Sequence, residues 1–437
     1  MEYLPNILFI ILLGFGIGFF AKNVKKLTRN IKLGRDVDVS DNKSQRWKNM
    51  AMIALGQSKM VRRPIAGFLH VVVYLGFIII NLEVLEIIID GISGKHRIGL
   101  SILPEAVYGF LIGAFEVLAI LVFVSVTIFW IRRNIIKLAR FWKSEMTSWP
   151  KNDANFILYF EMVLMMLFLV MNATDVHFQS LNTGNVISQY IASWFSGISE
   201  NTLHVVERAA WWFHIIGILV FLNYLYFSKH LHILLAFPNT FYGKLTPKGQ
   251  FNNLEAVTKE VKLMMDPNVD PFAAPAEGTE NDIPAKFGAS DVQDLNWVQL
   301  LNAYTCTECG RCTSECPANQ TGKKLSPRKI MMDTRDRLEE VGKNIDANKG
   351  AFKEDGKQLL DNYITREELW ACTSCNACVE ACPVSIDPLS IIIDMRRYLV
   401  MEQSAAPVEL NNMMTNIENN GAPWPYNQMD RLNWKNE

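Results

Sequence analysis

Cysteine is absent from this 437-residue chain before Cys306, and histidine is scarce, with seven in all. All eight cysteines lie in two short clusters, a pattern that excludes a scattered disulfide framework and favours metal ligation in a reducing compartment. An excess of basic charge is also absent. The formal net charge is −1 and no basic domain stands out, so nucleic acid is not an expected partner.

Long apolar runs are missing after about residue 235, where the chain is polar and rich in Pro and Asp/Glu, but they fill the part before it. A helix that spans a bilayer needs about 20 mainly apolar residues. Five stretches meet this requirement, near residues 4–21, 65–90, 105–131, 155–173 and 208–230. The sequence therefore predicts a five-helix transmembrane bundle over residues 1–235.

Lysine and arginine predict the orientation of this bundle, because cytoplasmic loops carry an excess of them. Residues 22–63 contain twelve and residues 132–151 contain six, whereas residues 174–207 contain none. The first apolar stretch lacks a positive amino-terminal region and a small-residue cleavage site, so we expect a retained helix. The amino terminus is then outside a bacterial cytoplasmic (inner) membrane, and the cysteine clusters lie in the cytoplasm.

Each cysteine cluster has the spacing C-x₂-C-x₂-C-x₃-C-P, which is typical of two-cluster ferredoxins. The first three thiolates of such a run bind one [4Fe–4S] cluster, and the fourth reaches across to the other. The predicted ligands are Cys306, Cys309, Cys312 and Cys382 for cluster 1, and Cys372, Cys375, Cys378 and Cys316 for cluster 2. Structural zinc is the weaker alternative, because it prefers two Cys-x₂-Cys pairs separated by a spacer.

The segment between the two motifs has helical features, since SPRKIMMDTRDRLEEV begins at a Ser–Pro start and ITREELWACT leads into the second motif. We expect an α-helical ferredoxin domain with two [4Fe–4S] clusters over residues 296–400. A cytoplasmic linker with one short helix precedes it over residues 236–295, and a tail follows over residues 401–437. The predicted fold class is mainly α.

Two histidines in the predicted bundle are candidates for haem b ligation. His70 lies near the cytoplasmic end of the second helix, and His232 follows the fifth. If the fifth helix continues through His232, the 18-residue step from His214 makes five turns, and His230 faces away. His70 and His232 then lie at similar depth, as bis-histidine ligation requires. The alternative is an interfacial His232 and a hydrogen-bonded His70 without a haem.

A second, distal haem would lie near His214, for which His177 is the best remaining partner, with His204 behind it. Carboxylates inside a membrane are functional candidates. Glu83 and Glu116 lie at depths comparable with His214, so we expect a quinone or proton site there. The alternative is that these carboxylates form hydrogen bonds between helices.

The cysteine motifs resemble those of the helical dicluster ferredoxin domains of heterodisulfide reductase iron–sulfur subunits. The membrane part, with His70 and the run NYLYFSKHLHILLAFPN, resembles the cytochrome b gamma subunit of respiratory nitrate reductase. In that subunit two haems use two histidines from helix 2 and two from helix 5. His70, His214 and His232 match three of them, and the outer ligand of helix 2 is missing. The resemblance also implies a soluble partner subunit of the CCG-domain or flavoprotein type.

These features predict an electron-transfer subunit without catalytic residues of its own. Electrons would pass between membrane quinone, haem b, the two [4Fe–4S] clusters and a soluble oxidoreductase. A haem-free membrane polyferredoxin that acts in cofactor maturation or redox sensing is the alternative.

Overall fold

The computed structural model describes residues 3–247, 249–268 and 286–436. Over these ranges the chain forms helices and short turns, and no β-strand longer than an isolated bridge. The prediction of a mainly α fold is confirmed.

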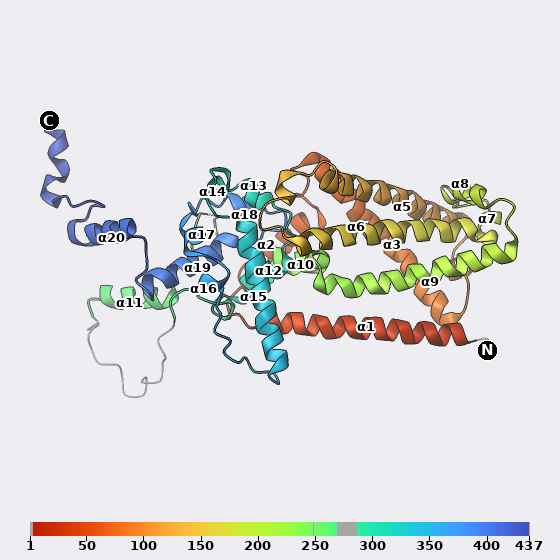
Figure 1. Ribbon diagram of the computed structural model, residues 1–437, viewed down its shortest axis with the longest axis horizontal. Helices are drawn as coiled ribbons and strands as arrows, with labels where there is room; N and C mark the ends of the chain where they lie inside the picture. Colours follow the sequence, from red (N-terminus) through yellow and green to blue (C-terminus); the bar gives the residue numbers. More distant parts are fainter. Residues whose placement is uncertain (1–2, 248, 269–285, 437) are drawn as a thin grey trace.

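Five long helices lie side by side in an elongated bundle that fills one half of the molecule (Figure 1). They are α1 (Leu4–Ile31), α3 (Pro64–Ser93), α5 (Glu105–Asn134), α6 (Ser148–Thr174) and α9 (Glu200–Tyr224). All five are long and apolar enough to cross a membrane. Large apolar side chains such as Phe15 and Phe110 are exposed on the outside of the bundle, as expected for contact with lipid. The prediction of five candidate membrane helices is confirmed.

The bundle is held by close contacts of apolar side chains. Phe168 and Ala119 are fully buried in its core. Gly91 of α3 allows α1 to approach, because a Cβ atom at this position would lie 2.6 Å from the ring of Phe9. We call the end of the bundle that carries the amino terminus the far end, and the opposite end the cluster end.

The fifth long helix does not continue to His232, and this part of the prediction is wrong. The helix α9 ends at Tyr224, two short turns follow, and Ser228 between them is extended with φ −117° and ψ 151°. Asp153 of α6 stabilises this break, because it accepts hydrogen bonds from the Tyr224 hydroxyl (2.7 Å) and from the Lys229 amide (3.1 Å). A new helix, α10 (His232–Phe241), then begins at His232.

Short elements close the two ends of the bundle. At the far end they are α4 (Ile98–Ile102), α7 (Val176–Ser180), α8 (Ser188–Ala192) and the turn Ser193–Phe195. At the cluster end they are α2 (Lys43–Met50), the π-helical turn Ala51–Leu55 and the turn Ala139–Phe141.

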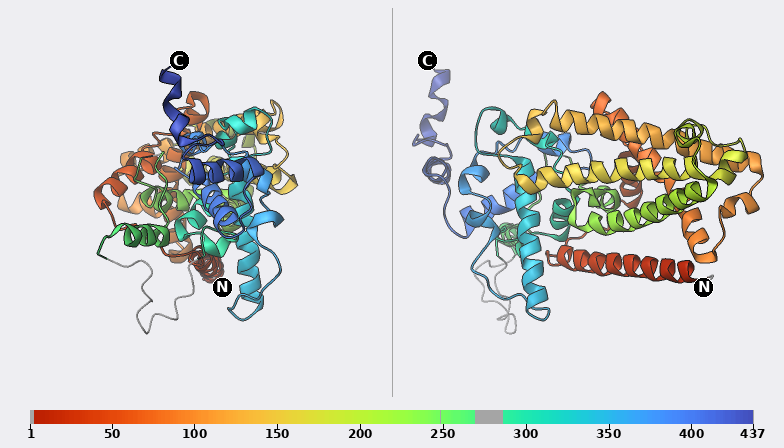
Figure 2. Two further views of the ribbon diagram at one scale, coloured as in Figure 1. Left: turned by 90° about the vertical axis from the view of Figure 1, so that its left-hand side faces the viewer. Right: turned by 45° about the vertical axis from the view of Figure 1, so that its right-hand side comes forward.

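The cysteine-containing part forms a second helical unit at the cluster end of the bundle (Figure 2). Its helices are α12 (Trp297–Thr305), α13 (Arg311–Ser314), α14 (Pro317–Gln320), α15 (Pro327–Ala347), α16 (Leu359–Asn362), α17 (Arg366–Trp370), α18 (Ala377–Ala381) and α19 (Pro388–Met401). The longest, α15, begins as predicted at a Ser–Pro step, where the Ser326 side chain caps it. The buried side chains of α12, α15 and α19 belong to one hydrophobic core.

Part of the predicted linker belongs to these two units. The helix α10 packs against α2 and α12, and Val292 and Leu295 are fully buried in the core of the cysteine unit. The short helix predicted in the linker is α11 (Glu255–Met265). Residues 248 and 269–285 of the predicted linker lie outside the described residues. The tail contains α20 (Val408–Asn420) and a 3₁₀ segment, Gln428–Lys435, that extend away from the rest of the chain.

Polar contacts join the cysteine unit to the bundle. The Asn30 amide donates to the Tyr304 hydroxyl (2.9 Å), and Asn239 donates to the backbone of Val384 (2.8 Å). The fully buried Arg328 pairs with Glu145 (2.6 Å). These contacts fix the cysteine motifs directly against the cluster end.

Candidate functional site

The two cysteine motifs form loops of the same shape. The third residue of each loop, Glu308 or Ser374, has a left-handed backbone with φ +54° or +56°. Gly310 and Asn376 are also left-handed, with φ +71° and +61°, and they start the short helices α13 and α18. Such a backbone turns the chain tightly around a point, so each loop directs its sulfurs inward.

The fourth cysteine of each motif interacts with two cysteines of the other motif. Cys382 interacts electrostatically with Cys309 and Cys312. In the same way Cys316 interacts with Cys372 and Cys378. The crossed ligand sets stay a prediction.

The sulfur groups fit a metal cluster. All four predicted cluster 1 ligands line one cavity: Cys306, Cys309, Cys312 and Cys382. Cys378 also borders this cavity. Burial raises the pKa of Cys306 to about 12 and that of Cys382 to about 11. These thiols therefore keep their protons unless a metal takes the proton's place. The Ile386 amide donates to the Cys382 sulfur at 3.3 Å, a hydrogen bond that suits a ligating thiolate.

Three histidines gather where the bundle meets the cysteine unit. The ring centroids of His70 and His232 are 6.4 Å apart, with 42° between the ring planes. When two imidazoles bind the same iron from opposite sides, each through a nitrogen at about 2 Å, their ring centroids are roughly 6 Å apart. The spacing therefore suits bis-histidine ligation of one haem iron.

The hydrogen bonds of the rings distinguish the two candidate ligands on the Lys229–His232 segment. His232 places Nδ1 3.2 Å from the Lys229 carbonyl oxygen, which orients the ring and leaves Nε2 free for a metal. His230 instead places Nε2 3.4 Å from the Glu161 carboxylate. The sequence analysis expected His230 to face away from His232 on a continuous helix. This prediction is wrong, because the His230 ring lies 5.3 Å from that of His232. Its pairing with Glu161 still makes it the weaker ligand.

Glu161 is a residue that the sequence interpretation missed. It is the one carboxylate in the apolar run NFILYFEMVLMMLFLV, and a lone carboxylate inside a predicted membrane helix was the signal that could have found it.

His70 and His232 lie next to the first cysteine loop. Arg311 stands between Cys309 and Cys312 and donates to the backbone carbonyl oxygens of Lys59 (3.3 Å) and Met60 (3.4 Å). The same guanidinium interacts electrostatically with His70. Cys375 of the second loop is exposed. The first loop therefore lies by the histidines, and one sulfur of the second loop is accessible from the surface.

His214 stands apart from these groups. It is fully buried on α9 beside Phe168, with ring centroids 6.2 Å apart. Neither ring nitrogen completes a hydrogen bond, although the backbone of Leu164 lies close to the ring.

The structure does not bring the predicted distal ligands to His214. Phe168 precedes the far end of α6 by six residues, or about 9 Å, and the exposed His177 lies beyond that end. His204 is exposed on α9, about 15 Å along the axis from His214.

The two candidate carboxylates of the bundle differ in their surroundings. Glu116 is fully buried and accepts three hydrogen bonds, from the Asn172 amide (3.0 Å) and from the backbone of Ile187 (2.7 Å) and Ser188 (3.0 Å). The bond to Asn172 joins two helices, which is the alternative given for these carboxylates in the sequence analysis. The two backbone bonds anchor the loop before α8. Glu83 is equally buried, but its Oε2 atom has no hydrogen-bond partner. Glu83 is thus the carboxylate with free hydrogen-bonding capacity.

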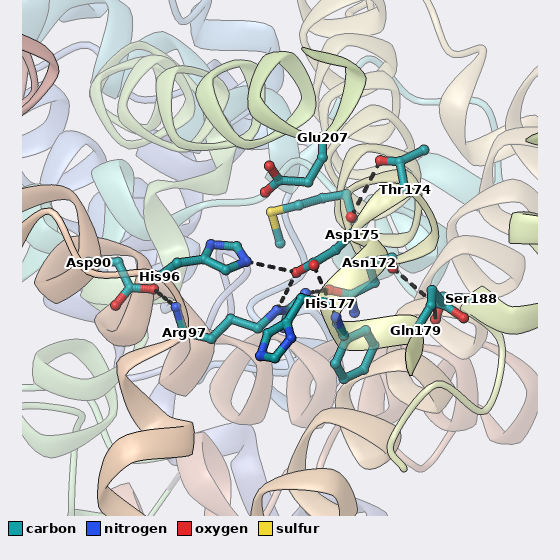
Figure 3. Close-up of polar contacts among 12 residues, drawn as sticks. Asp90, His96, Arg97, Asn172, Thr174, Asp175, His177, Gln179, Ser188 and Glu207 are labelled. Atoms are coloured by element: carbon teal, nitrogen blue, oxygen red, sulfur yellow. Dashed lines mark hydrogen bonds and ion pairs between the residues drawn. The ribbon is translucent and has the colours of Figure 1, made fainter. Parts of the chain in front are cut away.

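A network of ion pairs crosses the far end of the bundle (Figure 3). Arg97 donates to Asp175 (2.6 Å), whose Oδ2 also lies 3.0 Å from Nε2 of His96. Burial acts to raise the pKa of Asp175, but these hydrogen bonds outweigh it and hold the pKa well below its usual range. His96, Asp175 and Glu207 bring one possible metal-ligand atom each within 4.8 Å of the others.

The carboxylates of this network already have cationic partners. Asp175 pairs with Arg97, and Glu207 pairs with Arg208. We therefore assign the group to ion pairing at the far end of the bundle.

Comparison with known families finds a match at the cysteine motifs. The family model described as a 4Fe-4S dicluster domain matches residues 305–386, which include all eight cysteines. No solved structure matches the chain.

Several curated proteins are similar to this chain. A probable iron-sulfur-binding oxidoreductase FadF of Bacillus subtilis is 29% identical over 99% of the chain and 61% of its own length. An EtfAB:quinone oxidoreductase of Syntrophomonas wolfei is 25% identical over 94% of the chain and 57% of its own length. A probable membrane-anchored ferredoxin of Chromohalobacter salexigens is 32% identical over 35% of the chain and 25% of its own length. The chain thus spans about three-fifths of the length of the first two.

The resemblance to heterodisulfide reductase is also supported. One chain of the dihydromethanophenazine:CoB–CoM heterodisulfide reductase of Methanosarcina mazei is 28% identical over 34% of this chain and 36% of its own length. The relatives and the dicluster domain identify an iron–sulfur protein of the electron-transfer type, with helices that could span a membrane.

Proposed function

We propose that this chain is a membrane-bound electron-transfer subunit that works between the quinone pool and a soluble oxidoreductase. His70 and His232 hold one haem b, and the crossed cysteine sets hold the two [4Fe–4S] clusters. When bound, these iron centres supply one-electron transfer. The chain's own residues position the centres and separate them from water.

The observation that carries this proposal is the spacing of His70 and His232. Their rings are 6.4 Å apart beside the loop of cluster 1, and His232 has its Nδ1 fixed by a backbone carbonyl. The Nδ1 atom of His70 is buried without a hydrogen-bond partner. A buried ring nitrogen without a partner is costly unless something binds the ring.

The quinone site belongs at the far end, where Glu83 has free hydrogen-bonding capacity. His214 is a second candidate contact for the quinone, because it is buried with both nitrogens unpaired and no second histidine approaches it among the described residues. One haem therefore accounts for the histidines better than two. Glu116 is occupied by its loop.

The soluble partner docks over cluster 2, where Cys375 is exposed. The similarity to a protein named EtfAB:quinone oxidoreductase favours a partner of the flavoprotein type over one of the CCG-domain type. The Lys/Arg bias of the loops supports an amino terminus outside a bacterial cytoplasmic membrane and an iron–sulfur unit in the cytoplasm.

The test uses the full chain in lipid nanodiscs under anaerobic conditions. The protein is reduced with dithionite, freed of excess reductant and mixed with menadione, while haem absorbance and [4Fe–4S] electron paramagnetic resonance are followed. We expect reoxidation of both kinds of centre by menadione, and at least tenfold slower reoxidation of the clusters in His70→Ala. Clusters that stay reduced in the presence of menadione would overturn the proposal.

A further inference from the structure

Three carboxylates on one face of α3 lead from the core of the bundle to its far end. Glu83, Glu86 and Asp90 follow one another at steps of three and four residues, which are adjacent positions on a helix about 4.5 and 6 Å apart along the axis. A series of acidic side chains inside an apolar bundle is costly to maintain, so it calls for a function.

Glu83 forms the inner end of this series. It is 3% exposed, and its Oε2 atom has no hydrogen-bond partner. Its carboxyl group interacts electrostatically with Glu86, Asp90 and Arg97. The free oxygen leaves this carboxyl group able to form a hydrogen bond to a molecule bound beside it.

Glu86 forms the next step toward water. The Tyr108 hydroxyl lies 3.2 and 3.1 Å from its two carboxylate oxygens, and the Gly99 amide donates to it at 2.8 Å. Glu86 is half-buried, whereas Glu83 is buried. A carboxyl group beside a hydroxyl at the boundary between core and solvent can pass a proton in either direction.

Asp90 has a different role. Its two oxygens accept the backbone amides of Arg97 (2.8 Å) and Ile98 (3.0 Å), which fixes the turn into α4. That turn holds Arg97 in place, together with Asn172 (2.9 Å) and the ring of Phe178, 4.2 Å below the guanidinium. Arg97 also donates to the Tyr108 hydroxyl at 3.3 Å. A fixed cation thus stands beside Tyr108, and Figure 3 shows Arg97 with Asp90 and Asn172.

We infer that Glu83, Glu86 and Tyr108 form a proton route between a quinone at Glu83 and the aqueous phase at the far end of the bundle. This inference rests on the proposed function. Reduction of one quinone consumes two electrons, which the chain's iron centres supply, and two protons, which bind the two quinone oxygens. Each proton leaves Glu83 for a quinone oxygen and is replaced from water through the half-buried Glu86, to which the buried Tyr108 hydroxyl donates. Quinol oxidation reverses every step.

The route has a consequence for energy coupling. Electrons enter or leave at the cysteine unit, where Cys375 is exposed. Protons enter or leave at the far end of the bundle, opposite that unit (Figure 1). Each turnover therefore separates charge along the length of the bundle.

The test measures reoxidation of the dithionite-reduced chain in proteoliposomes by stopped flow, in H₂O and in D₂O. With menadione as oxidant, we expect Glu83→Gln and Glu86→Gln to react at about one tenth of the unmodified rate or below. Loss of a positioned acid predicts this decrease. Tyr108→Phe should slow the reaction with a larger solvent isotope effect. With ferricyanide, which takes electrons without protons, all three variants should match the unmodified chain.

Glu105→Gln is the matched control, because Glu105 is an exposed carboxylate at the same end, in the first turn of α5. It should leave both reactions unchanged. Unchanged menadione rates and isotope effects in Glu83→Gln and Tyr108→Phe would overturn the route while leaving the relay in place. No reoxidation of the unmodified chain by menadione would instead overturn the proposed function, and the route with it.

Discussion

His232 places its ring 6.4 Å from that of His70, although the long helix that precedes it ends at Tyr224. The intervening turns are held by Asp153, and the Lys229 carbonyl at the end of this segment accepts the hydrogen bond that orients His232. The close approach of these two rings therefore depends on a break in the helix.

The first prediction concerns the crossed cysteines. Cys316→Ser should remove the cluster held by Cys372, Cys375 and Cys378, because Cys316 lies with that group. Non-haem iron should fall from about eight to about four atoms per chain. Adding Cys375→Ser should cause no further loss, whereas adding Cys309→Ser should remove nearly all non-haem iron. If the Cys316→Ser/Cys309→Ser double variant kept one full cluster, the crossed assignment would be wrong.

The second prediction concerns the buried pair that joins the two units. Burial acts to raise the pKa of Glu145, but Arg328 and the Ser326 hydroxyl outweigh it and lower the pKa below its usual value of 4.5. A carboxyl group whose pKa is lower in the folded state stabilises the fold above pH 4.5. That contribution is lost as the pH falls through the folded-state pKa.

Glu145→Gln should therefore reduce the free energy of unfolding by about 3 kcal/mol at pH 7, because it leaves the Arg328 charge buried without its partner. The difference from the unmodified chain should shrink below pH 4.5. Thermal unfolding, followed by loss of cluster absorbance across this pH range, measures both effects. Glu354→Gln, at an exposed carboxylate of the same unit, is the control. Equal losses in the two variants would argue against a specific role for the pair.

The third prediction separates Glu116 from Glu83. Glu116→Ala leaves three donors without an acceptor, two of them backbone amides before α8. Each unpaired buried donor costs about 1–3 kcal/mol, so the loop should become sensitive to protease at lower temperature. The menadione reaction of the intact fraction should be unchanged. A large loss of quinone reactivity without any loss of stability would assign Glu116 to the quinone site instead.

The sequence was sufficient for features that depend on local patterns. Long apolar runs predicted the five helices, and the spacing of the cysteines predicted the dicluster domain, since both signals lie within a single short segment. The break before Lys229 was not predictable in this way, because Asp153 from another helix causes it. The same reason applies to the pairing of His230 with Glu161 and to the loop bonds of Glu116. These contacts join residues that are distant in the sequence, and helical periodicity does not describe them.

The most direct test of the relay is the dithionite-reduced minus oxidised absorbance spectrum of the purified chain, with haem quantified as its pyridine haemochrome. We predict one b-type haem per chain, lost in His70→Ala and in His232→Ala but retained in His230→Ala, whose ring lies next to that of His232. An unmodified chain without haem b, or a haem that survives both His70→Ala and His232→Ala, would contradict the account.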